Sequence, residues 1–181
     1  MAASTVMVAA IVQSRIRSAQ LVTVTQFHKS LNSTCIQFPT VKVNVGEDTS
    51  DAALRGLKEQ TGFSGRVVDS DSASSLLVLV KDPMNTAESS HLLLVEVDSD
   101  RPGNKELLSG EPRESVELIT LNSLNATLRT RGSSRKGVFI DSNLHSFTIG
   151  MERNKSFDRR PSELMSERRL SANPPSSDEV C

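Results

Sequence analysis

Residues 46–63, GEDTSDAALRGLKEQTGF, decide the fold, because their spacing predicts one helix with both ends marked. Asp48 or Thr49 can cap the start, since their side-chain oxygens can accept hydrogen bonds from the first free backbone N–H groups. Asp51 falls in the first turn, where the helix dipole favours a carboxylate. Gly62 stands where helices often end in a left-handed residue, which glycine adopts without strain. The sequence therefore predicts a helix that ends just before Gly62.

The predicted helix has an apolar face and a polar face. Leu54 and Leu57 lie three residues apart and point toward one apolar cluster. Gly56, Glu59 and Gln60 lie on another face at positions i, i+3 and i+4, the spacing at which one helix can present ligands to a divalent cation. Such a cation could bind a diphosphate. Of these three residues only Glu59 is an acid.

This pattern resembles the Nudix box, G-x5-E-x7-R-E-U-x-E-E-x-G-U, in which U is aliphatic or aromatic. The positions that match the box are Glu47, Arg55, Leu57, Glu59, Gly62 and Phe63. The positions that depart from it are the opening glycine, the acid after the arginine and the second acid of the pair, which are Val41, Gly56 and Gln60.

Other runs extend the resemblance over roughly residues 6–150. Residues 35–39, CIQFP, resemble the C-I-E-F-P run of the ADP-ribose or ADP-sugar pyrophosphatase branch, and residues 26–28, QFH, resemble its Q-F-R. Residues 114–121 resemble its late E-x-V-E strand. The resemblance implies an α/β protein with the Nudix fold, in which a mixed β-sheet is sandwiched between helices (α/β/α).

The resemblance also implies a metal-dependent chemistry. In that family the helix carboxylates and a loop carbonyl hold Mg²⁺ or Mn²⁺, and a glutamate positions the attacking water. Carried onto this sequence, the metal ligands are Glu47 and Glu59, and the catalytic carboxylates are Glu59 and Glu114. Gly56 supplies no ligand and Gln60 supplies no charge, so weak metal binding and impaired turnover are expected.

The sequence leaves a structural alternative open for each box residue. Glu59 follows Arg55 by four residues, which is the spacing of an ordinary ion pair on a helix. Glu47 can equally be a carboxylate at a helix start. Gly56 costs about 1 kcal/mol relative to alanine inside a helix, and no structural need for it is apparent. Val41 stands where the family needs a glycine, so the loop there follows another path or the phosphates no longer approach it.

The order of the chain predicts a Nudix-like domain over residues 1–151 and a disordered Arg- and Ser-rich tail over residues 152–181. Predicted helices beyond the box cover residues 121–128 and 138–151, and residues 98–110 form a polar loop. Strands are predicted at residues 6–12, 20–25, 35–38, 66–68, 76–80, 91–97 and 115–120, with the apolar run 76–80 buried. The acid-free start also fits a mitochondrial transit peptide, but the strand is favoured, because the same region resembles the family's opening hairpin and the alternation of residues 20–25 suits its partner strand.

Composition restricts the partners and the compartment. The formal net charge of -1 gives no reason to expect nucleic-acid or membrane binding. The two cysteines, Cys35 and Cys181, fit a reducing compartment, so we predict the cytoplasm, with the nucleus and, less favoured, the mitochondrion as alternatives. The chain has no Trp or Tyr to stack on a purine and starts too late for the family's swapped N-terminal sheet, so a monomer or non-swapped dimer is expected.

The predicted tail carries three serines that follow basic residues, at Ser156, Ser162 and Ser171. Kinases that recognise basic residues prefer such sites, and each phosphate would add strong negative charge. The alternative is a solvated tail in which these pairs arise from composition alone. A phosphorylated tail could serve regulation or docking to a protein partner.

Hypotheses of different classes follow for the function. The preferred one is a Nudix-fold protein with impaired catalysis that binds a nucleotide or a protein. The alternative is a Mg²⁺-dependent hydrolase that cleaves ADP-ribose or another nucleoside diphosphate sugar into a nucleoside monophosphate and a sugar phosphate. A third reading is that the chain is a shortened product of a longer gene.

Overall fold

A computed structural model describes residues 5–68, 78–80, 84, 88–110, 115–134 and 137–157 of the chain. Its strands are β1 (Thr5–Gln13), β2 (Gln20–His28), β3 (Ser33–Gln37), β4 (Thr40–Lys42), β5 (Arg66–Val67), β6 (Leu79–Val80), β7 (Ser89–Asp98), β8 (Val116–Thr120) and β9 (Val138–Ile140). Its α-helices are α1 (Thr49–Thr61), α2 (Pro102–Ser109), α3 (Leu124–Ser134) and α4 (Ser142–Phe157), and short 3-10 helices are η1 (Lys29–Leu31) and η3 (Leu121–Ser123).

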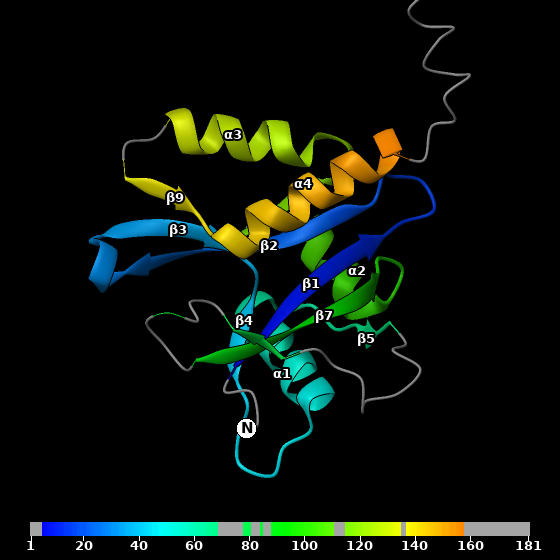
Figure 1. The fold of residues 1–181 in the computed structure, drawn as a ribbon. Helices are drawn as coiled ribbons and strands as arrows, with labels where there is room; N and C mark the ends of the chain where they lie inside the picture. The colour runs from blue at the N-terminus through cyan, green and yellow to red at the C-terminus, as the bar shows by residue number, and fades with distance from the viewer. Residues whose placement is uncertain are drawn as a thin grey trace, which may run out of the picture.

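Strand β1 is the centre of one mixed sheet. It runs parallel to β7, antiparallel to β2 across the predicted hairpin, and antiparallel to β4. The strand order along the main path is β5-β7-β1-β2-β3-β9, with β4 paired to β1, β6 to β7 and β8 to β2. Figure 1 shows α3 and α4 together on one side of this sheet and α1 on the other.

Alternate residues of β1 enter two separate hydrophobic cores, because successive side chains of a strand point to opposite faces. One core joins Val6, Val8, Ala10 and Val12 to Leu57 of α1 and to Phe63. The opposite core joins Met7 and Ala9 to Leu124 and Leu128 of α3 and to Leu144 of α4. Helices therefore cover both faces of a mixed sheet, which confirms the predicted α/β/α architecture.

Most of the predicted elements are present. The strands predicted at residues 6–12, 20–25, 35–38, 66–68, 91–97 and 115–120 lie within three residues of their expected bounds. The helix predicted over residues 121–128 is present as η3 and α3, but it continues to Ser134. The last segment differs, since residues 138–140 form β9 and the helix follows as α4. Asp141 starts that helix by accepting hydrogen bonds from the N–H groups of Asn143 and Leu144 at 2.9 and 3.1 Å. Because α4 continues to Phe157, the predicted domain boundary after residue 151 falls inside a helix.

Two sequence predictions are wrong. Residues 98–110 are not a loop, because α2 forms there with Pro102 at its first position. The apolar run expected to be buried is exposed where it is described, with Val78 and Val80 49% and 48% exposed. Strand β6 pairs with β7 at the two residues Ser89 and Ser90. Because this pairing is short, the side chains of residues 78–80 remain in contact with solvent.

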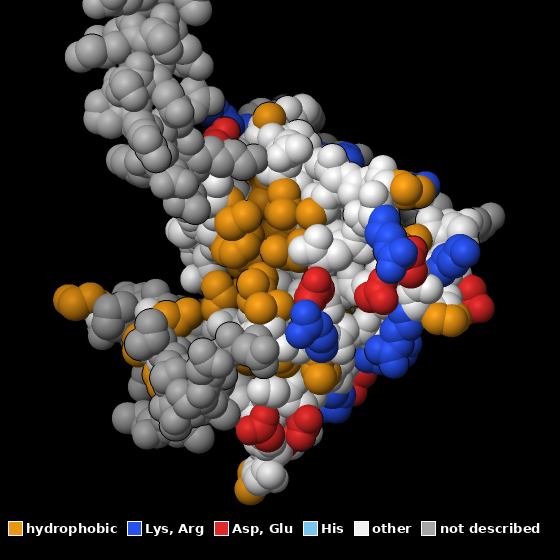
Figure 2. Space-filling model, turned by 90° about the vertical axis from the view of Figure 1, so that its right-hand side faces the viewer, with side chains coloured by type: hydrophobic (Ala, Val, Ile, Leu, Met, Phe, Trp, Pro, Cys, Tyr) orange, Lys and Arg blue, Asp and Glu red, His pale blue; other side chains and the backbone are white. Residues whose placement is uncertain are grey.

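Hydrophobic side chains also gather on one face of the molecular surface, beside acidic and basic side chains (Figure 2). Val68 and Leu94, joined by a backbone hydrogen bond of 2.9 Å, are 37% and 39% exposed. Of the helices in the described part of the chain, none combines the length and the apolar character needed to cross a membrane.

Candidate functional site

Helix α1 begins and ends as its sequence predicts. The Asp48 carboxylate accepts a hydrogen bond from the Ser50 N–H at 2.7 Å, and Asp51 lies in the first turn. Gly62 ends the helix with a left-handed φ of 81°. Leu57 is fully buried in the core below the sheet, where burying such a side chain contributes about 1.5 to 3 kcal/mol. The box helix is thus fixed in place along its whole length.

Gly56 packs directly against Val41, and this contact joins two of the departures from the box. Val41 lies in β4, where it pairs with Val6 of β1, so it is part of a strand and not of a loop with positive φ. A Cβ atom on residue 56 would lie 2.6 Å from both Cβ and Cγ1 of Val41. Real Cβ atoms do not approach that closely, so the valine requires glycine there. The sequence interpretation that Gly56 meets no structural need is therefore wrong.

Gln60, the third departure, binds the backbone of the neighbouring residue of β4. Its Nε2 donates to the carbonyl oxygen of Thr40 at 2.6 Å, and its Oε1 accepts from the Thr40 N–H at 3.3 Å. A glutamate could accept from the N–H but could not donate to the carbonyl. The amide is thus matched to both groups of this strand, and its oxygen is already used.

Glu47 forms a bidentate ion pair with Arg55. Arg55 donates from Nε and from a terminal nitrogen to the two carboxylate oxygens at 2.7 and 2.8 Å. The Asn44 N–H also donates to Glu47 at 2.9 Å, and Arg55 reaches the Lys42 carbonyl at 3.0 Å. Hydrogen bonding by Arg55 lowers the pKa of Glu47 from 4.5 to about 2. Both oxygens of this predicted metal ligand are engaged in holding β4 and α1 together.

Glu59 is the remaining box carboxylate, and its side chain is 58% exposed. It lies 3.4 Å from Arg55, the i,i+4 ion pair that its spacing allows. Within the residues that the structure describes, no group of three or more His, Cys, Asp or Glu side chains could hold a metal ion. Among the described residues, one exposed carboxylate paired with Arg55, beside a glycine and a bonded amide, does not fit Mg²⁺, which prefers several anionic oxygens in an octahedral arrangement.

The other predicted site residues cannot be compared with this arrangement. Glu114, Ser162 and Ser171 lie outside the described residues. Ser156 falls in the last turns of α4, where only the backbone is described. Their catalytic and regulatory roles remain predictions.

A cleft lies on the sheet face opposite α1, beside β4. It has a volume of about 340 Å³ and is lined by Thr5, Met7, Gln26, His28, Gln37, Thr40, Val41, Lys42 and Asp141. Sequence comparison singled out residues 26–28 and 35–39 as runs, but it did not predict that Gln26, His28 and Gln37 meet. β2 and β3 pair antiparallel with Gln37 opposite Val24, and the Gln37 side chain bonds to both His28 and Gln26, at 2.8 and 3.2 Å.

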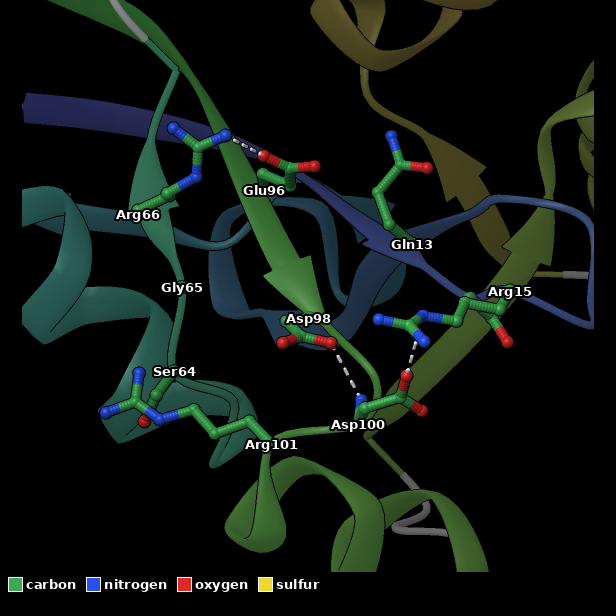
Figure 3. Close-up of a pocket in the computed structure, with 10 residues that line it drawn as sticks. Gln13, Arg15, Ser64, Gly65, Arg66, Glu96, Asp98, Asp100 and Arg101 are labelled. Carbon is green, nitrogen blue, oxygen red and sulfur yellow. Dashed lines mark hydrogen bonds and ion pairs between the residues drawn. The ribbon is translucent and has the colours of Figure 1, made fainter.

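A larger depression of about 660 Å³ lies where β1 and β7 end (Figure 3). Arg15 reaches toward Asp100 at 3.7 Å, and Arg66 donates to Glu96. The third carboxylate that lines the depression, on Asp98, accepts a hydrogen bond from the Asp100 N–H at 2.8 Å. Among the described residues that line the depression, positive and negative side chains are balanced, and two ion pairs form between them, so these residues offer no excess charge that would select a ligand.

Acid is expected to weaken the fold through Glu47. Its folded-state pKa of about 2 lies below the ordinary 4.5, so the stabilisation is complete above pH 4.5 and is lost as the pH falls toward 2. Urea unfolding between pH 6 and pH 2.5 should show this loss, and Glu47→Gln should remove that part of the slope. Glu59→Gln keeps the Glu47–Arg55 pair and should keep the slope. Equal slopes for Glu47→Gln and the unmodified chain would contradict the assignment.

Solved structures with the same fold define the class of this protein. The chain is similar to the crystal structure of Caenorhabditis elegans Ap4A hydrolase, with a TM-score of 0.53 over 85% of this chain and 98% of that one. The sequences are 10% identical, so this likeness concerns the fold alone. Together with the box segment on α1, it defines a Nudix fold.

Sequence relatives identify the family. The chain is 33% identical over 130 residues to an uncharacterized Nudix hydrolase of Schizosaccharomyces pombe, covering 70% of this chain and 60% of the relative. It is 35% identical over 97 residues to ADP-ribose pyrophosphatase of Saccharomyces cerevisiae, covering 53% and 40%. It is 26% identical over 156 residues to ADP-sugar pyrophosphatase of Mus musculus, covering 83% and 67%. No family model matches this chain. The chain belongs to the Nudix hydrolase superfamily, and it spans about 60% or less of the length of the first two of these relatives.

Proposed function

We propose that this chain is a Nudix-fold binding module with impaired hydrolysis, which binds a nucleotide-derived or protein ligand. The observation that supports it best is the contact between α1 and β4. Val41 fills the space over Gly56, and Gln60 holds the backbone of Thr40. The positions that resemble metal-binding positions of the box therefore serve packing.

The charge balance supports the same proposal. A diphosphate needs cations close to its oxygens, and Mg²⁺ supplies them in Nudix hydrolases. Here Glu47 is neutralised by Arg55, and Glu59 is mostly exposed. A cation held by Glu59 alone would bind weakly and would not orient an attacking water.

The alternative is residual Mg²⁺-dependent hydrolysis of ADP-ribose or another nucleoside diphosphate sugar. Its support is the similarity to proteins named ADP-ribose pyrophosphatase and ADP-sugar pyrophosphatase. For the tail we propose phosphorylation at Ser156, Ser162 and Ser171, supported by the basic residues before each serine.

The purified full chain is expected to release no AMP from ADP-ribose in the presence of Mn²⁺ over many hours. The physical reason is the missing ligand charge at Gly56 and Gln60. Chromatography of the nucleotides measures the product, and the yeast ADP-ribose pyrophosphatase serves as the active control. AMP production that Glu59→Gln abolishes would support the hydrolase instead.

A further inference from the structure

The cleft beside β4 takes its polar wall from one face of two paired strands. Thr5 pairs with Lys42 and Met7 pairs with Thr40 across β1 and β4, and all four line the cleft. Val41, between them, turns its side chain to Gly56 on the opposite face. Val41 therefore packs on the face of β4 that is turned toward α1, and the opposite face of the strand, with Thr40 and Lys42, lines the cleft.

A chain of hydrogen bonds crosses the cleft wall. His28 Nε2 lies 2.8 Å from Gln37 Oε1, and Gln37 Nε2 donates to Gln26 Oε1 at 3.2 Å. Because Gln37 Oε1 is an acceptor, the imidazole donates from Nε2, and in the neutral imidazole Nδ1 is then an acceptor. No residue in the described part of the chain bonds to that Nδ1 or to the Gln26 amide nitrogen. This wall of the cleft thus offers a ligand one hydrogen-bond donor, on Gln26, and one acceptor, on His28.

The cleft has little charge to offer a phosphate. The described residues that line it include one ammonium group, Lys42, and one carboxylate, Asp141. Asp141 faces the start of α4, where it accepts from the Asn143 and Leu144 N–H groups. A diphosphate would meet a single exposed cation together with a repelling carboxylate. The volume of about 340 Å³ is at the small end of ligand pockets, which span about 300–1,000 Å³.

We propose that this cleft binds an uncharged ligand with an amide-type edge, which carries a hydrogen-bond donor beside an acceptor, as in the base of a nucleoside or in a primary carboxamide. Gln26 donates to the ligand's acceptor, and His28 accepts from its donor. The inference rests on the proposed function, since it names the ligand class of a site that binds without hydrolysis. Phosphates on the ligand add nothing to its affinity here.

Calorimetry with the full chain tests this ligand class. The probes are adenosine, guanosine, cytidine, uridine and nicotinamide, with the 5′-monophosphate of each nucleoside and ADP-ribose as phosphorylated counterparts, all with and without Mg²⁺. At least one uncharged probe is expected to bind, and its 5′-phosphate form is expected to bind no more tightly. The four nucleosides separate a nucleobase from the simple carboxamide, nicotinamide.

Variants locate the binding. Gln26→Ala removes the free donor and keeps the His28–Gln37 bond. It should raise the Kd of the probe by about tenfold, as expected for one lost hydrogen bond of about 1.4 kcal/mol. Gln13→Ala, a matched change in the distant depression, should leave affinity unchanged. Circular dichroism confirms that each variant is folded.

Several results would overturn the inference. The inference is wrong if no uncharged probe binds, if ADP-ribose binds more tightly than adenosine, or if Gln26→Ala binds the probe as tightly as the unmodified chain does. Tight ADP-ribose binding without AMP release would overturn this inference and leave the proposed function intact. AMP release would overturn the proposed function itself.

Discussion

Gly56→Glu is expected to lower the free energy of unfolding by about 4 kcal/mol or more, although it restores an acid of the Nudix box. Overpacking costs about 1–3 kcal/mol, and a buried charge without a partner costs about 3–5 kcal/mol. The new Cβ would lie 2.6 Å from Val41, and residue 56 is buried against β4. Urea denaturation measures the loss, and Gly56→Ala gives the steric part alone if the glutamate variant fails to fold.

A double-mutant cycle isolates the contact. Val41→Gly removes the atoms that the new side chain would strike, so combining it with Gly56→Glu should recover about 1–3 kcal/mol relative to the sum of the single changes. Gly132→Glu in α3 is the matched control, because a Cβ there meets only Ile140 Cγ1 at the ordinary distance of 3.5 Å. Equal losses at residues 56 and 132, or simple additivity in the cycle, would show that α1 and β4 are not tightly packed.

Asn104→Ala is expected to cost about 3 kcal/mol, since it removes a buried amide that joins three segments. Asn104 is 1% exposed, and its Oδ1 accepts from the Ser64 N–H at 2.9 Å. Its Nδ2 donates to the carbonyls of Ser64 and Asp98, both at 2.8 Å. Truncation would remove the side-chain partner of these half-buried backbone groups, at up to about 1–3 kcal/mol each before relaxation.

Thermal and urea unfolding of Asn104→Ala should therefore show a lower midpoint with an unchanged denaturant dependence. Lys105→Ala, the next residue of α2, is exposed and should change stability by less than about 0.5 kcal/mol. If the two variants unfold alike, the amide does not hold α2 against the end of β7.

Short-range rules predicted much of this fold. The start of α1 at Asp48, its end at Gly62 and the burial of Leu57 each depend on a few neighbouring residues, and all are as predicted. The hairpin of β1 and β2 follows from the alternation of residues 20–25 and from the family's opening hairpin, which this region resembles. The family resemblance then supplied the arrangement of layers that local patterns do not encode.

Contacts between distant residues were not predictable from the same rules. Which way Val41 points depends on the register of β4 against β1, so its contact with Gly56 cannot be inferred from the sequence alone. Helix α2 was missed because its residues are mostly polar, although Pro102 at the start and Leu107 and Leu108 on one side were usable signals. Asn104 looks like a loop residue until its three backbone partners are known.

The interlock of Val41 with Gly56 also constrains how this sequence can change over time. A glutamate gained first at residue 56 strikes the valine, and a glycine gained first at residue 41 leaves a hole beside the helix. Either order passes through a less stable intermediate, so the two positions must mutate almost together. Restoring the box residues therefore needs two substitutions, and the first of them alone destabilises the protein.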